Sequence, residues 1–407
     1  MAIDNKDKKV LKSSIEREQN EVACSAECEK IKGSKNLNVP HLRFPEFTEE
    51  WEKIRLDSFT ERVMRKNKNN LSKLPLTISA QYGLVDQITF FNKVVASTDM
   101  SNYYLLKKGE FAYNKSYSSD YPWGAIKRLD NYEQGALSSL YICFAPKDKV
   151  ETDFILQYFE SPKWHKGVSE IAVEGARNHG LLNISVQDFF HTHHYMPKDK
   201  KEQTKIAKLL MLLDERIATQ NKIIEKLQSL IKGLAAQLTQ SGTPNIRLCD
   251  CLECHSSTLQ ENCVSVTGSY PVYGATGLIG YTNNYAYNGE SILIVKDGSG
   301  VGSLSYVNDH FSVIGTLNYL TAKENYSILY LYYALMAFNF TPYITGMAIP
   351  HIYFKDYGKA KLFYPSIEKR IRIASLLHNI EQKLVVEQNL VISLSAQKSY
   401  LLRMLFI

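Results

Sequence analysis

The clearest hydrophobic pattern in the sequence is a heptad repeat that occurs twice. In the first run, positions step alternately by four and three residues, and all but one are apolar: Ile206, Leu210, Leu213, Ile217, Gln220, Ile224, Leu227, Ile231, Leu234 and Leu238. Such a seam predicts a long helix that buries the seam on a partner helix. Pro197 precedes the run, and Ser241-Gly242-Thr243-Pro244 follows it with residues that commonly end helices.

The partner helix is predicted in the same chain. The second run has the same phase: Ile373, Leu377, Ile380, Leu384, Glu387, Val391, Leu394, Lys398, Leu401 and Leu405. The polar interruption Gln220 corresponds to the polar Glu387, and each run follows a proline. We therefore predict an antiparallel pair arising from an internal duplication, with Gln220 near Val391 and Glu387 near Ile224. The alternative is two unrelated amphipathic helices that pack on separate cores.

The regions before the two helices also resemble each other. Ile54-Arg55-Leu56 returns as Ile246-Arg247-Leu248, and Gly109-Glu110 before a strand-like run returns as Gly289-Glu290. We expect an α/β (α+β) fold with two mixed recognition domains, joined by the helix pair as a pseudo-two-fold repeat. The predicted divisions are a polar extension at 1–38, a first domain at 39–195, helices at 196–240 and 364–407, and a second domain at 241–363.

Composition describes a folded protein with only a mild charge excess. The chain has 407 residues, 44% hydrophobic residues and a net charge of +6, so any nucleic-acid surface must be local. No apolar signal segment is visible at the N-terminus, and the longest apolar run, 328–340, is too short to span a bilayer. The seven cysteines are expected to be free thiols in a reducing cytoplasm.

The segment Leu42-Arg43-Phe44-Pro45-Glu46-Phe47, the helix start with Glu202-Gln203 and Ile206-Ala207, and the doubled order of domain and helix resemble a type I restriction-modification specificity subunit. The resemblance covers residues 40–407 and departs from the family at Ile367-Glu368-Lys369-Arg370, where Glu-Glu-Gln is usual. It implies that each domain recognises half of a split DNA target, and that the helices dock two methyltransferase subunits and set the half-site spacing. Restriction/translocase subunits would join them, and the partners would hold S-adenosylmethionine and ATP/Mg.

The sequence contains no signature of chemistry in this chain itself. A phosphate-binding loop and an Asn-Pro-Pro-Tyr-like methyltransferase pocket are both missing from the sequence, so we expect a non-catalytic protein. The glycine run 298–302 lies between two strand-like segments and predicts a hairpin rather than a cofactor loop. Cys249, Cys251, Cys254, His255 and Cys263 provide half of a zinc pattern, and we expect a structural role. His191, His193 and His194 are expected at the surface or facing another subunit.

Candidate DNA contacts are polar, basic and aromatic residues in predicted loops and at strand ends, several of them in corresponding places of the two domains. They are Arg62, Arg65, Lys66, Lys68, Gln81, Tyr82, Lys115, Ser116, Tyr117, Arg177, Asn178, His179, Tyr273, Thr276, Lys296, Ser299, Thr345 and His351. The alternative function is a coiled-coil scaffold that binds proteins without recognising DNA. If the helices act as a ruler, an insertion near Ala235-Ala236-Gln237, which we expect to be exposed, changes the target spacing.

Overall fold

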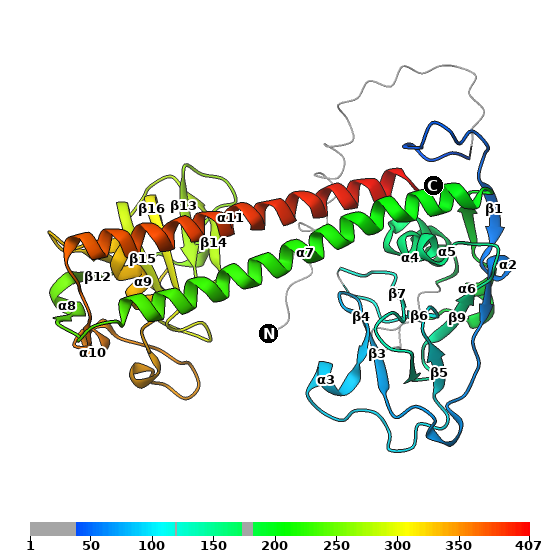
Figure 1. Ribbon diagram of the computed structural model, residues 1–407, viewed down its shortest axis with the longest axis horizontal. Helices are drawn as coiled ribbons and strands as arrows, with labels where there is room; N and C mark the ends of the chain where they lie inside the picture. Colours follow the sequence, from blue (N-terminus) through cyan, green and yellow to red (C-terminus); the bar gives the residue numbers. More distant parts are fainter. Residues whose placement is uncertain (1–37, 119, 173–181) are drawn as a thin grey trace. The chain divides into compact units, whose positions relative to one another are not determined.

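The computed structural model describes residues 38–118, 120–172 and 182–407. These residues form two compact units. The first contains the chain up to Leu210 together with Ser399–Ile407, and the second contains Met211–Lys398. Each unit therefore combines one globular block with parts of both long helices, α7 (Lys200–Thr239) and α11 (Ile367–Met404) (Figure 1).

The first block is built from three small sheets. A two-stranded sheet pairs β1 (Glu52–Arg55) with β10 (His193–Met196), which brings the two ends of the block together. One four-stranded sheet has the order β2 (Thr60–Arg62), β9 (Ile142–Pro146), β6 (Phe111–Asn114) and β7 (Ala125–Arg128). The other has the order β4 (Gly83–Asp86), β3 (Pro75–Ser79), β8 (Gln134–Leu137) and β5 (Tyr104–Lys107).

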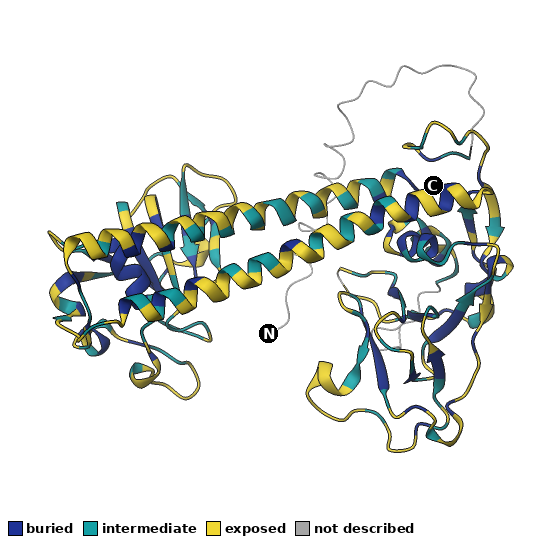
Figure 2. Cartoon of the chain, in the orientation of Figure 1, coloured by how far each residue is buried: buried dark blue, intermediate teal, exposed yellow. Residues whose placement is uncertain are grey.

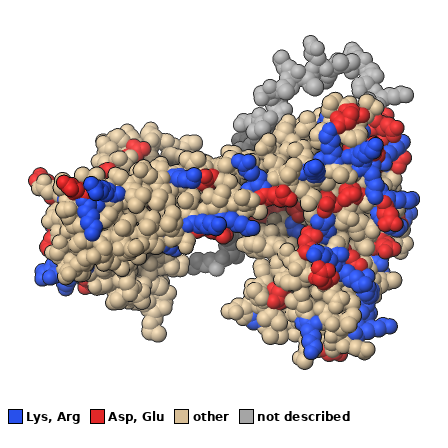
Figure 3. All heavy atoms as spheres, in the orientation of Figure 1, with Lys and Arg blue, Asp and Glu red and all other residues tan. Residues whose placement is uncertain are grey.

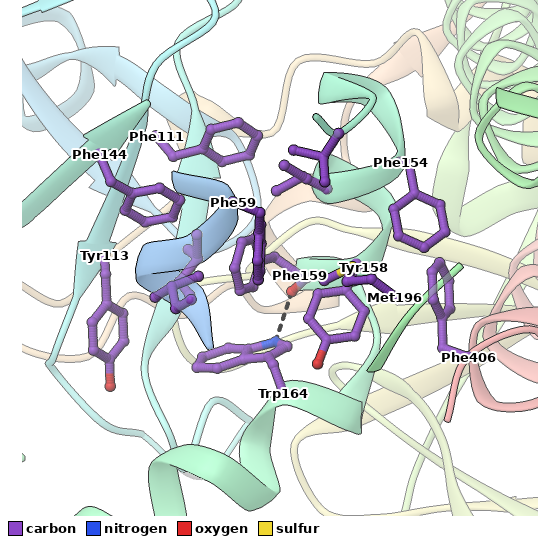
Figure 4. Packing of buried hydrophobic residues seen from close by; sticks show 14 of the residues in the cluster. Phe59, Phe111, Tyr113, Phe144, Phe154, Tyr158, Phe159, Trp164, Met196 and Phe406 are labelled. Atoms are coloured by element: carbon purple, nitrogen blue, oxygen red, sulfur yellow. Dashed lines mark hydrogen bonds between the residues drawn. The ribbon is translucent and has the colours of Figure 1, made fainter. Parts of the chain in front are cut away.

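Short helices complete the first block. They are α2 (Leu56–Phe59), α3 (Gln87–Phe91), α4 (Thr152–Glu160), α5 (His165–Ile171) and α6 (Val186–His191), with the 3-10 turns η1 (Lys68–Asn70) and η2 (Pro162–Trp164). An aromatic core lies between the β2-β9-β6-β7 sheet and the helices α2, α4, α5 and α6 (Figure 4). Phe406 from the end of the chain is fully buried in this core and lies 5.3 Å from Phe154, ring centre to ring centre. Leu402 near the end of α11 and Leu405 and Phe406 just beyond it are thus part of the core of the first block.

The second block contains one larger sheet. Its strand order is β12 (Leu252–Ser256), β17 (Leu317–Ala322), β15 (Tyr287–Val295), β16 (Leu304–Val313), β13 (Tyr270–Gly274) and β14 (Gly277–Thr282). A two-stranded sheet of β11 (Ile246–Arg247) and β18 (Lys361–Leu362) closes the block. Its helices are α8 (Leu248–Cys251), α9 (Ile328–Met336) and α10 (Phe354–Tyr357), with the turns η3 (Glu261–Cys263) and η4 (Thr341–Tyr343).

The repeated tripeptide has the same structural role in both blocks. Ile54 and Arg55 end β1, and Leu56 begins α2 as a fully buried residue. In the second block β11 ends at Arg247, and the buried Leu248 begins α8. In each case the strand pairs with the last strand of its own block. The internal repeat is therefore a structural one.

Within the second unit, α7 and α11 pack side by side and run antiparallel. Asp214 forms an ion pair with Lys398, with a nitrogen–oxygen distance of 2.5 Å. Just beyond the other end of α7, Ser241 accepts a hydrogen bond from Lys369, near the start of α11. Every predicted seam position of both helices is buried or half-buried, and the residues between them are mostly exposed (Figure 2). The predicted antiparallel arrangement is confirmed. In the middle of the pair Gln220 bonds directly to Glu387, so the two polar residues meet each other rather than Val391 and Ile224.

Two further expectations are corrected. His194 is buried rather than superficial, because its ring nitrogens bond to the Tyr158 hydroxyl at 2.8 Å and the Thr192 hydroxyl at 2.7 Å. Ala235 is also fully buried, because the end of α7 enters the core of the second block. Among the residues that the structure describes, no helix has both the length and the apolar character needed to cross a bilayer.

Candidate nucleic-acid interface

The start of each long helix is held by a side chain that bonds to the preceding proline. Gln203 donates to the Pro197 carbonyl at 2.9 Å and accepts from the Glu151 backbone N–H at 2.8 Å. In the second repeat Arg370 donates to the Pro365 carbonyl at 2.7 Å. The chain departs from the family pattern at this position, yet the arginine makes the same contact with the proline that the glutamine makes.

The other motif residues are joined within the first unit. The Arg43 guanidinium forms a two-bond ion pair with Glu202, with nitrogen–oxygen distances of 2.7 and 2.8 Å. The Trp51 indole also donates to this carboxylate, at 3.2 Å. Glu202 is only 2% exposed, so these partners stabilise its carboxylate in place of water. Three residues of the motifs that carry the resemblance, Arg43, Glu202 and Gln203, therefore fix the helix to its block.

Two lysines occupy equivalent strand ends. Lys115 follows the last residue of β6, and Lys296 follows the last residue of β15. Lys115 donates to the Ile184 carbonyl at 3.4 Å and lines a pocket of about 200 Å³ with Arg62, Tyr104 and Tyr141. The pocket combines two cations with two phenol rings, which are groups that can contact a phosphate and a sugar or base edge.

The basic run after β2 is largely occupied by protein contacts. Arg65 pairs with Glu110 at 2.8 Å and donates to the Leu105 carbonyl at 3.0 Å. Lys66 donates to the Asn102 carbonyl at 2.8 Å, and its ammonium lies 4.3 Å from the centre of the Tyr104 ring. Arg62 and Lys68 are exposed, and within the described part of the chain neither forms an ion pair. Of the four basic residues in this run, Arg62 and Lys68 are therefore the ones available to bind phosphate.

The remaining candidates of the first block that the structure describes are exposed. Gln81 and Tyr82 form the turn between β3 and β4, and Tyr82 is 68% exposed. Ser116 and Tyr117 continue the chain beyond Lys115, and both are exposed. Arg177, Asn178 and His179 lie outside the described residues.

The candidates of the second block come from three separate loops. Tyr273 and Thr276 belong to the β13–β14 hairpin, where Thr276 is exposed and the Tyr273 ring contacts Phe311. Ser299 lies in the glycine-rich connection between β15 and β16, which pair antiparallel, so the predicted hairpin is confirmed. Thr345 and His351 pair through their backbones, and His351 also bridges to Asp297. The structure thus joins the glycine loop to the 345–351 loop.

Several surface features were not predictable from the sequence. Phe90 and Phe91 are 43% and 44% exposed on α3, where Phe90 contacts the Tyr82 ring. In the second block a polar depression of about 460 Å³ is lined by residues such as Thr282, Asn284 and Tyr285. Nothing in the local pattern identified these residues, because single polar or aromatic residues in loops have no periodicity.

The cysteine-rich segment is explained by packing. Cys251 is buried and donates to the Leu248 carbonyl, and burial raises the pKa of its thiol to about 12. Cys254 accepts from Asn318, and His255 bonds to the Thr321 hydroxyl at 2.9 Å. In the described ranges, no three His, Cys, Asp or Glu side chains gather as a metal site would require.

Charge is distributed unevenly along the chain. In 245–363, acidic side chains outnumber basic ones, whereas Lys and Arg exceed Asp and Glu in the segments 196–244 and 364–407 that contain the long helices. Figure 3 shows a largely uncharged surface over the sheet of the second block and intermixed charges over the first. Contacts between the second block and DNA would therefore depend on polar and apolar side chains more than on cations.

Comparison with known proteins finds similarity to one class of protein. Residues 246–394 match the family described as the type I restriction modification DNA specificity domain. The EcoprrI specificity subunit of Escherichia coli is 28% identical over 112 residues, which are 28% of this chain and 28% of that protein. The type I specificity subunit S.MpnORF285P of Mycoplasma pneumoniae is 30% identical over 138 residues, which are 32% of this chain and 43% of that protein. The matched segments span less than half the length of these curated relatives.

A solved structure extends the similarity of the fold over both blocks. The type I restriction-modification system S subunit from M. genitalium superposes with a TM-score of 0.60 at 18% identity, covering 91% of this chain and 99% of that chain. The sequence matches are partial, whereas the likeness of the fold includes both blocks and both long helices. The chain is thus similar to type I restriction-modification specificity subunits in sequence over residues 246–394 and in fold over both blocks.

Proposed function

We propose that this chain recognises a split DNA target for a type I restriction-modification complex, with one half-site bound by each block. The observation that carries the proposal is the structural repeat. Each block has its own sheets, its own strand-end lysine and its own set of exposed loops. Two complete recognition units in one chain suit a target with two different halves.

The test exchanges one block and maps methylation. The block 41–195 or 245–363 is replaced by that of a related protein, and the methylated motif is determined across the genome of cells that express the complete system. We expect the exchange to change one half of the motif and to leave the other intact. A motif that changes in both halves, or in neither, would contradict independent recognition.

We further propose that the outer face of the helix pair docks methyltransferase subunits. Three apolar residues of α11 recur at heptad spacing outside the seam and are exposed: Ile371 at 59%, Val385 at 44% and Ile392 at 67%. A second apolar stripe on a helix that already has a partner suits a further helix. Val385→Lys with Ile392→Lys should abolish co-purification with the methyltransferase subunit, whereas the exposed Gln382→Lys, on the same helix, should not.

In this proposal the chain itself performs no catalysis. S-adenosylmethionine would bind to the methyltransferase subunits, and ATP and Mg²⁺ to the restriction subunits. The purified chain alone should therefore transfer no methyl group to DNA that contains the motif, and adding the methyltransferase subunit should start the transfer. Methyl transfer by the isolated chain would refute this assignment.

A further inference from the structure

The loop between η4 and α10 holds two apolar side chains in solvent. Met347 is fully exposed, with a relative accessibility of 106%, and Ile349 is 65% exposed. Neither side chain belongs to a hydrophobic cluster of the second unit. Exposed apolar surface of this kind contributes nothing to folding, and it gains free energy only when something covers it.

The conformation of this loop is fixed by its backbone. Thr345 and His351 exchange hydrogen bonds of 2.9 and 2.8 Å across its base. The neighbouring glycine loop adds a bond from the Gly298 N–H to the Pro350 carbonyl at 2.9 Å. Gly346 has φ +88°, and a Cβ there would lie 2.3 Å from the Ile349 carbonyl oxygen. The loop therefore presents Met347 in a defined position.

The surroundings of the loop indicate what covers it. Lys296 bonds through its carbonyl to the Ile352 N–H at 3.0 Å, directly beside the base of the loop. The Lys355 ammonium lies 5.1 Å from the Tyr353 ring centre. Neither lysine has an ion-pair partner among the described residues. An apolar tip whose neighbours include two lysines without ion-pair partners, as well as Asp297 at its base, suits duplex DNA, which has phosphates outside and stacked bases inside.

We propose that Met347, supported by Ile349, is a wedge that enters one base step of the half-site bound by residues 245–363 and partly unstacks it. This inference rests on the proposed function of that block. A wedge obtains affinity from apolar contact, so it explains how a block in which acidic residues outnumber basic ones can bind DNA. Pyrimidine–purine steps unstack most easily, so the wedge favours a TA or CA/TG step in or beside that half-site.

The test uses the complete complex of this chain with its methyltransferase subunits and a duplex that carries the mapped motif. 2-Aminopurine is placed at successive positions of the half-site, and its fluorescence reports unstacking. Met347→Ser removes the wedge, Met347→Leu keeps its size and apolar character, and Val266→Ser is the control. Val266 is 91% exposed in a different loop of the same unit.

We expect fluorescence to rise at one step, to fall to the level of free duplex in Met347→Ser and to persist in Met347→Leu and Val266→Ser. Affinity for the motif should fall about tenfold in Met347→Ser alone, as after loss of a base contact. A fluorescence rise at the methylated base that occurs in every variant belongs to the methyltransferase and is not the wedge signal.

Three results would overturn the proposal that Met347 is a wedge. The first is a wild-type complex that binds and methylates the motif without unstacking any step other than the methylated base. The second is an unstacking signal that survives Met347→Ser. The third is a Met347→Ser chain that no longer co-purifies with the methyltransferase, which would assign the loop to protein contact. A wild-type complex that binds no DNA specifically would instead refute the proposed function itself.

Discussion

Gln220 and Glu387, which are 167 residues apart and occupy corresponding positions of the two repeats, bond to each other in the middle of the helix pair. Corresponding residues of an antiparallel duplicated pair meet only where the local two-fold axis of that pair passes. At such a position an amide and a carboxylate satisfy each other, whereas two carboxylates would repel. The difference between the repeats at this position therefore stabilises the pair and fixes its register.

Replacing the amide by a second acid should break this relationship. Gln220→Glu places two carboxylates together in a part-buried seam and should destabilise the helix pair by about 1–3 kcal/mol at pH 7. Repulsion raises the pKa of the carboxylate pair in the folded state, so the lost stability should return as the pH falls through that raised pKa. Urea unfolding at pH 7 and pH 5 measures the effect. The isosteric Glu387→Gln is the control, because it keeps a hydrogen bond at this position without repulsion.

His194 should make the first unit sensitive to acid. Burial lowers the pKa of its imidazole to about 3, below the ordinary value of 6.5. Between these values the unfolded chain binds a proton that the folded chain does not, so stability falls as the pH drops below about 6.5. At pH 5 the unfolding free energy should be about 2 kcal/mol lower than above pH 6.5, because each pH unit below that value removes about 1.4 kcal/mol.

The comparison of wild type with His194→Gln isolates this effect. Glutamine can still bond to the Tyr158 or Thr192 hydroxyl, but it does not titrate. The difference in unfolding free energy between the two proteins should be constant above pH 7 and should move in favour of the variant at lower pH. A difference that stays constant down to pH 5 would show that His194 is protonated in the folded protein. His165, whose pKa burial also lowers, is present in both proteins and cancels.

The Arg43–Glu202 pair should be the most sensitive link between a block and its helix. Among the described residues, Arg43→Met leaves the buried Glu202 carboxylate with only the Trp51 indole as a hydrogen-bond partner, and the variant should lose about 3 kcal/mol of unfolding free energy. Adding Glu202→Gln removes the uncompensated charge and should restore part of this loss. Unfolding followed by tryptophan fluorescence measures both variants.

A neighbouring ion pair provides the control. Lys205 bonds to Glu46 in the same region, but both side chains are 47% exposed and in contact with water. Lys205→Met should therefore leave the unfolding midpoint nearly unchanged. Equal losses for Arg43→Met and Lys205→Met would show that burial does not determine the importance of these pairs.

The helices and their antiparallel pairing were predictable from the sequence because the apolar positions of a heptad repeat all lie on one buried face of the helix. The Gln220–Glu387 contact was not, since a pattern of positions specifies a face but not which side chains reach each other. The repeat was visible because Ile-Arg-Leu begins each block with the same strand and buried leucine. The sequence did not show which of the candidate DNA-contact residues are free to bind. Arg65 and Lys66 resemble free cations in the sequence, but their partners lie 45 and 36 residues away.

The exposed tip of the 345–351 loop could not be predicted for a related reason. Met347 and Ile349 alternate with small residues, and such a segment is equally typical of a short buried strand. Only the bonds to the glycine loop, about fifty residues earlier, turn these side chains toward solvent. Exposure set by distant backbone contacts has no local sequence signal.

The spacing of the half-sites should depend on the length of the helix pair. Because Ala235 is buried in the second block, an insertion has to lie nearer the middle of α7 and must be matched in α11. Seven residues inserted after Lys226, with seven after Glu381, keep the Gln220–Glu387 pair on one side and the Glu381 bonds to Tyr332 and Tyr333 on the other. One heptad nearly preserves the phase of the seam, with a residual rotation of about 20°.

Each helix then lengthens by about 10 Å, at 1.5 Å per residue, which corresponds to about three base pairs of duplex. We expect the methylated motif of the doubly inserted strain to keep both half-sites and to gain about three base pairs between them. The same insertion in α7 alone should prevent methylation, because the polar pair and the block contacts of α11 can no longer form together. If the doubly inserted protein methylates the original motif with its original spacing, the helices do not set the distance between the half-sites.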